Sequence, residues 1–255
     1  MKNSIMITVT LLWMLMASAM PSAAEEQNVV DHSIFDGLLT RYVDDGLVDY
    51  QGWREYSAED WQRYLDILRD TDPRNLVSDD ERLAFWINAY NAFTIEGVLK
   101  RYPLQTIRPT VLGIPNPEFW HEKVYLVNRR TYTLDAIEHK ILRKEFREPR
   151  IHFAIVCASL GCPKLVKSAF TGANVQKMLD TATQTFMRDP EKVRFDFRTN
   201  TLWLSSIFNW FADDFRKDGG SVEKFVGRYL PEITKNHSKK LHVKYLDYDW
   251  KLNTQ

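Results

Sequence analysis

The chain has 255 residues, with 34 basic and 34 acidic side chains and a formal net charge of zero. This balance gives no electrostatic footprint for nucleic acid or an anionic membrane, so we expect neither as a partner. Residues 1–24 have the pattern of an export signal: an apolar run ends in small residues before a cleavage point after Ala24. We therefore expect residues 25–255 to form a single soluble domain that is exported, either periplasmic or secreted.

Two helices are predicted early in the chain by capping pairs. Ser57 precedes Asp60 and Ser78 precedes Glu81, the spacing at which a hydroxyl caps a helix and an acidic side chain supports its first turn. The second helix should end by about Arg101, before a proline. Its apolar residues lie nearly all the way round, so we expect it to be buried.

Asn88 and Asn91 are unusual on this second helix, because they stand three positions apart on one face of an otherwise apolar segment. A buried amide needs hydrogen-bond partners. These side chains either fasten a neighbouring loop through its backbone, which is the commoner role, or point at a ligand.

Further elements follow from hydrophobic periodicity and turn residues. The apolar, β-rich run Arg150–Cys157 predicts a central strand. Helices dominate and the hairpins are short, so the fold class is α+β: a single, mainly helical domain with short β-hairpins and a central apolar strand. The other expected elements are a hairpin over 124–134 turning at 128–130, helices over 134–146 and about 175–186, a hairpin over 193–204 turning at 199–200, helices over about 205–219 and 221–229, and a last strand or extended arm over 241–250.

The two cysteines, Cys157 and Cys162, are the sharpest chemical feature of the chain. In an oxidising compartment they predict a disulfide, and so short a loop would contribute only about 2 kcal/mol as a local clamp. Cys157 is alternatively a free nucleophile. We expect no metal and no cofactor, because neither the cysteines nor the six histidines show a metal-binding spacing.

His139 is the candidate base for Cys157. On its predicted helix it follows Asp135 by one turn, so the carboxylate would orient the imidazole. Glu138 falls on the apolar stripe of the same helix and needs a partner or a raised pKa. The alternative is a solvated helix face for Asp135 and His139 and a salt bridge for Glu138. His152 is a poorer partner, because strand alternation would place it on the face opposite Cys157; we expect a core or ligand-facing histidine held by a hydrogen bond.

Five segments together resemble the domain of unknown function 547 family: "FWINAYNAFTI", "LDAIEHKILR", "IHFAIVCASLGCPKL", "LSSIFNWFADDF" and "YLDYDW". The core motifs run from 78 to 250. Some family members carry glutaredoxin-like domains, which suggests a link to thiols. The resemblance implies that the motif residues with chemical capacity share one site, namely Asn88, Asn91, Glu138, His139, His152, Cys157, Ser159 and Cys162.

Three functions stay open from the sequence. The first is a thiol-dependent hydrolase or acyl transferase, with Cys157 as nucleophile, His139 as base, Glu138 or an asparagine as orienter and Ser159 helping to hold an oxyanion; its substrate would be peptide-like or a thiol-containing small molecule. The second is a non-catalytic binding or scaffold protein with a Cys157–Cys162 disulfide. The third is a redox protein cycling the same thiols, although the spacing is not Cys-x-x-Cys.

Overall fold

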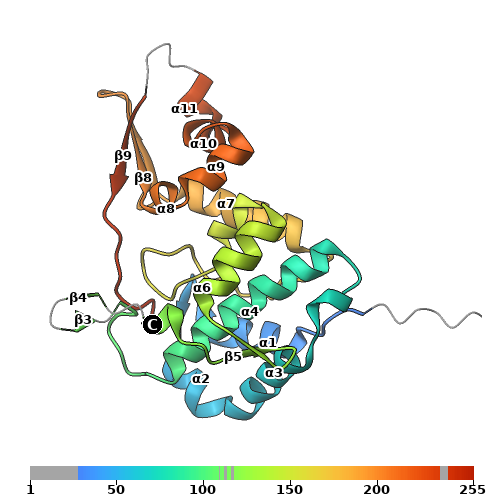
Figure 1. Cartoon of the computed structure of the whole chain (residues 1–255). Helices are drawn as coiled ribbons and strands as arrows, with labels where there is room; N and C mark the ends of the chain where they lie inside the picture. The colour runs from blue at the N-terminus through green and yellow to red at the C-terminus, as the bar shows by residue number, and fades with distance from the viewer. Residues whose placement is uncertain (1–27, 109, 112–113, 116–117, 236–240) are drawn as a thin grey trace, which may run out of the picture.

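The structure is a computed structural model that describes residues 28–108, 110–111, 114–115, 118–235 and 241–255. The expected export signal lies outside these residues. The α+β class is confirmed, because helices dominate and the strands form small sheets (Figure 1). In the part of the chain that is described, no helix is both long enough and apolar enough to span a membrane.

The first core is built around the long helix α4 (Asp79–Leu99). The Ser78 hydroxyl accepts the Glu81 N–H at 3.1 Å, so this predicted cap is confirmed. Nearly every residue of α4 is buried, as its all-round apolar pattern predicts. The elements that precede or pack beside it are α1 (Ser33–Tyr42), α2 (Tyr50–Tyr56), α3 (Ala58–Asp70), η1 (Pro73–Asn75) and α5 (Glu118–His121).

Three two-stranded antiparallel hairpins accompany this helical body. The hairpin expected over 124–134 is confirmed, and it turns through Asn128 and Arg129, both at positive φ (46° and 55°). Such a two-residue turn matches the right-handed twist of the strands. The hairpins are β1 (Val43–Asp44) with β2 (Leu47–Val48), β3 (Thr110–Val111) with β4 (Ile114–Pro115), and β5 (Tyr125–Val127) with β6 (Arg130–Tyr132).

The helix predicted over 134–146 is present but changes type along its length. It starts as α6 (Leu134–Ala136), with the Thr133 hydroxyl capping the Ala136 N–H, and continues as the π-helix η2 (Ile137–Phe146). π-helical segments are rare and are often found at functional sites.

The central strand expected over 150–157 is wrong. The chain forms a 3₁₀-helix, η3 (Pro149–Phe153), followed by an irregular buried segment. Pro149 starts the helix, and the Glu148 carboxylate accepts the Arg150 N–H. Beyond η3, the Asn91 side chain supplies the backbone hydrogen bonds that a neighbouring strand would otherwise provide. The apolar run is therefore buried without being a strand.

A second core lies above the first in Figure 1, between α7 (Val175–Arg188) and a three-stranded sheet of order β7-β8-β9. The hairpin β7–β8 is antiparallel, as predicted, and β9 joins β8 in parallel. The remaining elements of this part are β7 (Val193–Asp196), β8 (Thr201–Ser205), α8 (Ile207–Trp210), α9 (Ala212–Gly219), α10 (Val222–Tyr229), α11 (Pro231–Lys235) and β9 (His242–Leu246).

Residues 247–255, which we call the C-terminal strap, run from β9 back down to the first core (Figure 1). Backbone hydrogen bonds join the strap to residues 157–162, which we call the cysteine loop. Leu160 N–H donates to Lys251 O at 2.9 Å, and Gly161 N–H donates to Asp249 O at 2.7 Å. Asn253 in turn donates to Ala158 O at 3.1 Å. The strap therefore holds the cysteine loop in place.

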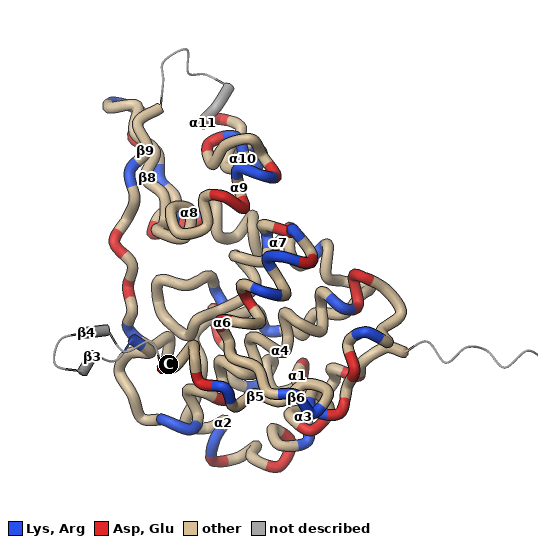
Figure 2. The backbone as a smooth tube through the Cα atoms, viewed as in Figure 1, with Lys and Arg blue, Asp and Glu red and all other residues tan. Residues whose placement is uncertain are grey.

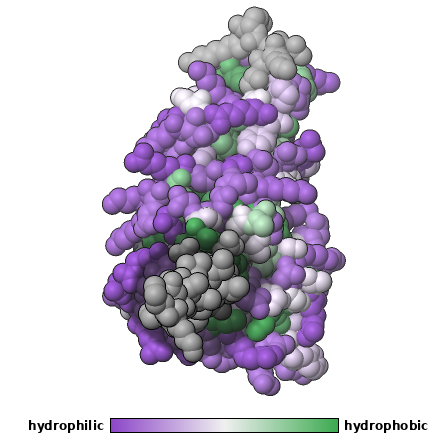
Figure 3. Space-filling model, turned by 90° about the vertical axis from the view of Figure 1, so that its right-hand side faces the viewer, coloured by the Kyte–Doolittle hydropathy of each residue, from purple (hydrophilic) through white to green (hydrophobic). Residues whose placement is uncertain are grey.

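Charged residues of both signs are spread over both parts of the molecule (Figure 2), in keeping with the net charge of zero. The face shown in Figure 3 is mainly hydrophilic, with hydrophobic residues in small separate groups.

Candidate functional site

A cavity of about 250 Å³ lies where the two cores meet. Its wall combines residues of the first core, such as Ile155, with residues of the second, such as Ile207 and Phe211. Aromatic side chains dominate the wall, and its charged or chargeable groups include two carboxylates and three histidines but, among the described residues, no lysine or arginine. The polar and aromatic residues of the wall are Tyr90, Trp120, His121, Asp135, Glu138, His139, His152, Cys157, Cys162, Trp210, Phe211, Tyr248 and Trp250.

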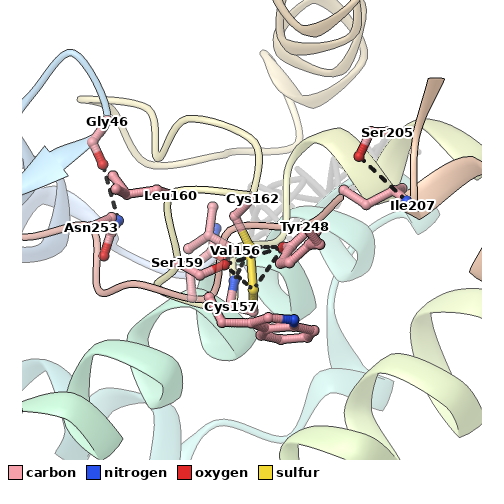
Figure 4. Close-up of a disulfide and its surroundings, with 12 residues drawn as sticks. Gly46, Val156, Cys157, Ser159, Leu160, Cys162, Ser205, Ile207, Tyr248 and Asn253 are labelled. Atoms are coloured by element: carbon pink, nitrogen blue, oxygen red, sulfur yellow. Dashed lines mark hydrogen bonds between the residues drawn. A yellow bond between two sulfur atoms is a disulfide. The ribbon is translucent and has the colours of Figure 1, made fainter. Parts of the chain in front are cut away.

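Cys157 and Cys162 form part of this wall and lie at disulfide distance, with their Cα atoms 6.2 Å apart (Figure 4). The loop reverses at Ala158, which has a left-handed φ of 59° that costs an ordinary residue about 1 kcal/mol. The Cys157 N–H points at Cys162 Sγ from 2.8 Å. Cys157 is half-buried whereas Cys162 is 6% exposed, so Cys157 is the more accessible of the two residues.

Tyr248 of the C-terminal strap places its hydroxyl against both sulfurs. The hydroxyl oxygen lies 3.1 Å from Cys157 Sγ and 3.1 Å from Cys162 Sγ, and it also accepts a hydrogen bond from Ser159 at 3.2 Å (Figure 4). Burial raises the pKa of Tyr248 above its usual range, so the phenol keeps its proton. A protonated hydroxyl in this position stabilises a thiolate on either cysteine by donating to it.

Glu138 projects into the same cavity from η2. Removal from water raises its pKa to about 7, and a hydrogen bond from the Tyr90 hydroxyl at 3.1 Å offsets this only in part. The expectation that a carboxylate on this apolar stripe has a partner or a raised pKa is confirmed in both respects. Its negative charge also contributes to the raised pKa of Tyr248, after burial. Glu138 is therefore a buried carboxyl with a raised pKa in the wall of the cavity that both cysteines line.

His139 lines the cavity, and in the described part of the chain no hydrogen bond joins it to Cys157. The Arg143 guanidinium donates to His139 Nδ1 at 2.7 Å, and Nε2 lies 3.5 Å from the Asp135 carboxylate, which is the expected orienting partner. Burial lowers the pKa of His139, and Asp135 opposes this shift. The ring is thus neutral, with its acceptor nitrogen already occupied by Arg143.

His152 lies in the wall of the same cavity as Cys157, so the placement on opposite faces is wrong because the strand that implied it does not form. The imidazole is buried, stacks on Phe211 at 3.9 Å and donates from Nε2 to Asp214 at 2.9 Å. Burial lowers the pKa of His152. For Asp214, burial opposes ionisation, but the hydrogen bonds from His152 and Arg143 outweigh it and hold the pKa well below its usual range. His152 is thus a histidine held by a hydrogen bond and facing the cavity.

Asn88 and Asn91 are buried outside the cavity wall, and both take the fastening role. Asn91 donates to Ala154 O at 3.0 Å and accepts the Val156 N–H at 2.9 Å. Asn88 makes the same pair of bonds to Phe170, at 2.7 and 3.0 Å. Asn91 therefore positions the segment that leads into Cys157.

The structure brings together five of the eight residues that the sequence motifs suggested: Glu138, His139, His152, Cys157 and Cys162 line one cavity. Ser159 lies directly behind, 3.1 Å from Cys157 Sγ. Among the described residues no group of three or more metal-ligating side chains is arranged to hold a metal ion.

Sequence reasoning missed the partners contributed by the C-terminal half. Tyr248 and Trp250 come from "YLDYDW", and Trp210, Phe211 and Asp214 come from "NWFADD". The signal was the density of aromatic residues in these two segments, which exceeds what an extended arm or a solvated helix needs.

Residues 73–187 match the model of the family described as "Protein of unknown function, DUF547". The matched range includes both cysteines, Glu138, His139 and His152 and stops before Asp214 and Tyr248. No curated protein and no solved structure was found to match the chain.

Proposed function

Since the chain belongs to the DUF547 family, whose description names no activity, we propose a function from the geometry of the cavity: a thiol–disulfide oxidoreductase that uses Cys157 and Cys162. One observation carries this proposal. The two sulfurs lie at disulfide distance in the wall of a cavity, with one hydroxyl 3.1 Å from each of them.

The reaction is a two-electron exchange with a substrate dithiol. A substrate thiolate attacks Sγ of Cys157, the more accessible cysteine; the new S–S bond forms, the Cys157–Cys162 bond breaks, and its electron pair leaves on Cys162. The second thiolate of the substrate then attacks the substrate sulfur of the mixed disulfide. An S–S bond forms within the substrate, the bond to Cys157 breaks, and Cys157 leaves as a thiolate. The substrate leaves as a disulfide, and the protein holds two thiols. The reverse sequence reduces a substrate disulfide.

The polar groups around the sulfurs suit this exchange. The Cys157 N–H and the Tyr248 hydroxyl both lie within hydrogen-bond distance of Cys162 Sγ, where the leaving thiolate develops. Glu138, with a pKa of about 7, is the group in the cavity best matched to supply or take up the proton of a thiol near neutral pH. The step therefore needs no group beyond those in the wall.

The substrate class follows from the size and lining of the cavity. A volume of about 250 Å³ with aromatic walls accommodates a thiol-containing small molecule or the cysteine side chain of a peptide with its apolar neighbours. Export through residues 1–24 would place the protein in an oxidising compartment, where a protein disulfide persists as an oxidant.

Trapping of a mixed disulfide tests this function directly. Cys162→Ser leaves Cys157 without its resolving partner, so incubation with oxidised glutathione should add one glutathione per chain, detected by intact mass. Cys157→Ser leaves only the buried Cys162 and should label far more slowly. For the wild type, equilibration in glutathione buffers should give a reversible two-electron transition between the disulfide and two alkylatable thiols.

Two experimental outcomes would instead support the other two functions considered for this protein. If the disulfide resists glutathione while the protein is folded, and neither single variant is labelled, Cys157–Cys162 is a structural clamp of a binding protein. If the reduced protein instead cleaves peptide or ester substrates, and Cys157→Ser and His139→Ala abolish the cleavage, the chain is a thiol hydrolase.

A further inference from the structure

A second cavity, of about 610 Å³, is lined by Arg143. The guanidinium of Arg143 also donates to His139 in the wall of the first cavity, which we call the cysteine cavity. The second cavity is formed between the end of η2, the start of η3 and α9. None of the eight motif residues that the sequence suggested as a site is among the residues that line it, and the proposed redox chemistry does not use it. The residues that line it are Arg143, Lys144, Arg147, Glu148, Pro149, Ile151, Asp214, Lys217 and Asp218.

The three carboxylates of this second cavity are already neutralised by arginines. Glu148 receives two hydrogen bonds from Arg150, at 2.8 and 2.6 Å. Asp214 is paired with Arg143 at 2.6 Å. Asp218 is paired with Arg228. None of the acidic groups is therefore left to balance a further cation.

Three cations of the same cavity have no such partner. Within the described ranges, no ion pair involves Lys144, Arg147 or Lys217, and all three side chains are exposed around the cavity. Arg143 adds a donor deeper in the wall, because its Nε and Nη1 are used by Asp214 and His139 whereas Nη2 makes no hydrogen bond to any described residue. The cavity wall thus holds four cations against three carboxylates, a net charge of +1, on a protein whose net charge is zero. Among the described residues, its three exposed cations have no ion-pair partner.

We propose that this second cavity is a binding site for a small polyanion with several carboxylate or phosphate groups. Three cations from two separate elements, Lys144 and Arg147 at the end of η2 and Lys217 on α9, can face different anionic groups of one ligand. The volume exceeds what a lone inorganic ion fills, which favours a molecule with more than one charged group. Arg143 connects this ligand to the cysteine cavity, since its guanidinium also holds His139 and the Asp214 partner of His152.

Calorimetric titration of the full chain with pyrophosphate and with citrate tests the site and separates the two ligand chemistries. At low ionic strength we expect at least one of them to bind with a dissociation constant on the order of 0.1–1 mM, and this binding to weaken at least tenfold at about 0.5 M salt. Tighter binding of pyrophosphate would point to phosphate groups, and tighter binding of citrate to carboxylates; either result supports the site.

Matched variants localise the binding. Lys144→Gln with Lys217→Gln should weaken it by about tenfold, because two exposed charges are removed from the cavity. Lys177→Gln, which removes an exposed lysine of α7 that lies outside the cavity, should leave binding unchanged. The proposal is overturned if neither anion binds, or if the double variant binds as tightly as Lys177→Gln. All of these side chains are exposed, so the variants should fold like the wild type.

Discussion

The hydroxyl of Tyr248 lies 3.1 Å from Cys157 Sγ, although the two residues are 91 positions apart in the chain. The C-terminal strap brings this group to a loop formed much earlier in the sequence. The surroundings of the two sulfurs thus include a residue outside the family-matched range.

Removal of this hydroxyl should make the reduced cysteines less acidic. In Tyr248→Phe a thiolate on Cys157 loses a donor that lies at hydrogen-bond distance, so we expect its pKa to rise by roughly one unit. The rate of iodoacetamide alkylation of the reduced protein, measured across pH, gives this pKa. Tyr245→Phe is the control, because that ring is 40% exposed on β9 outside the cysteine cavity. Identical pH profiles for the two variants would contradict the proposed role of the hydroxyl.

The two fastening asparagines allow stability to be separated from cysteine chemistry. Asn91→Ala and Asn88→Ala each leave a buried backbone N–H and C=O without their side-chain partner, so each should lower the free energy of unfolding by about 2–4 kcal/mol in urea denaturation.

Only Asn91→Ala should also speed the reduction of the disulfide by dithiothreitol, because Asn91 holds the segment that leads into Cys157. An equal acceleration in Asn88→Ala would show that general loosening of the fold, rather than the position of the cysteine loop, controls reactivity.

Glu138 should make the stability of the protein depend on pH. Its pKa is about 7 in the folded protein and near 4.5 in the unfolded chain, so between these values the folded state holds a proton that the unfolded state has lost. The contribution of this protonated carboxyl to the free energy of unfolding is fully present below about pH 4.5. It is lost as the pH rises through 7, and the loss is at most about 3 kcal/mol. In Glu138→Gln, the decline of the free energy of unfolding over this range should be smaller by that amount. The free energy of unfolding is measured by urea denaturation at several pH values. Parallel pH curves for wild type and variant would show that burial does not shift the pKa of Glu138.

Asp214 and its neighbour Asp213 form a matched pair for the ion network beside His152. The Asp214 side chain is 15% exposed and accepts from both Arg143 and His152, so Asp214→Asn should cost about 2–3 kcal/mol of stability at neutral pH. Asp213 is 76% exposed and pairs with Arg216, so Asp213→Asn should change stability by less than about 0.5 kcal/mol.

The pKa of Asp214 is lowered in the folded protein, so its contribution is present above the pKa of the unfolded chain and is lost on acidification. The difference in free energy of unfolding between Asp214→Asn and Asp213→Asn should therefore shrink at low pH. A difference that stays constant down to strongly acidic pH would indicate that the loss comes from packing rather than from charge.

Elements whose signals are local in the sequence were predicted well. The helix α4 follows from the Ser78 cap and its all-round apolar pattern, and the β5–β6 hairpin follows from polar residues between two β-rich runs. The raised pKa of Glu138 also follows from its place on an apolar stripe. For the helix and the hairpin, the interactions that decide the structure lie within one or two turns of the chain. For Glu138, the apolar stripe of its own helix already indicates burial.

The segment after Pro149 could not be predicted in this way. An apolar, β-rich composition fits equally well whether the backbone hydrogen-bonds to a neighbouring strand or to a side chain. Here the backbone bonds to the Asn91 amide, which is 63 and 65 positions away from its two partners. The error carried over to His152, whose predicted orientation depended on that strand. Tyr248 was missed for the same reason, since periodicity within "YLDYDW" contains no information about a contact with a distant loop.

The C-terminal strap also fixes the order in which the site is assembled during synthesis. Helix α4, the cysteine loop and Glu138 leave the ribosome well before Tyr248 and Asn253, which close the cavity and anchor the loop. Until those last residues arrive, the two thiols belong to an open loop that lacks the hydroxyl and the backbone contacts of the finished protein. A disulfide formed before the strap docks would form in surroundings chemically different from those of the folded protein.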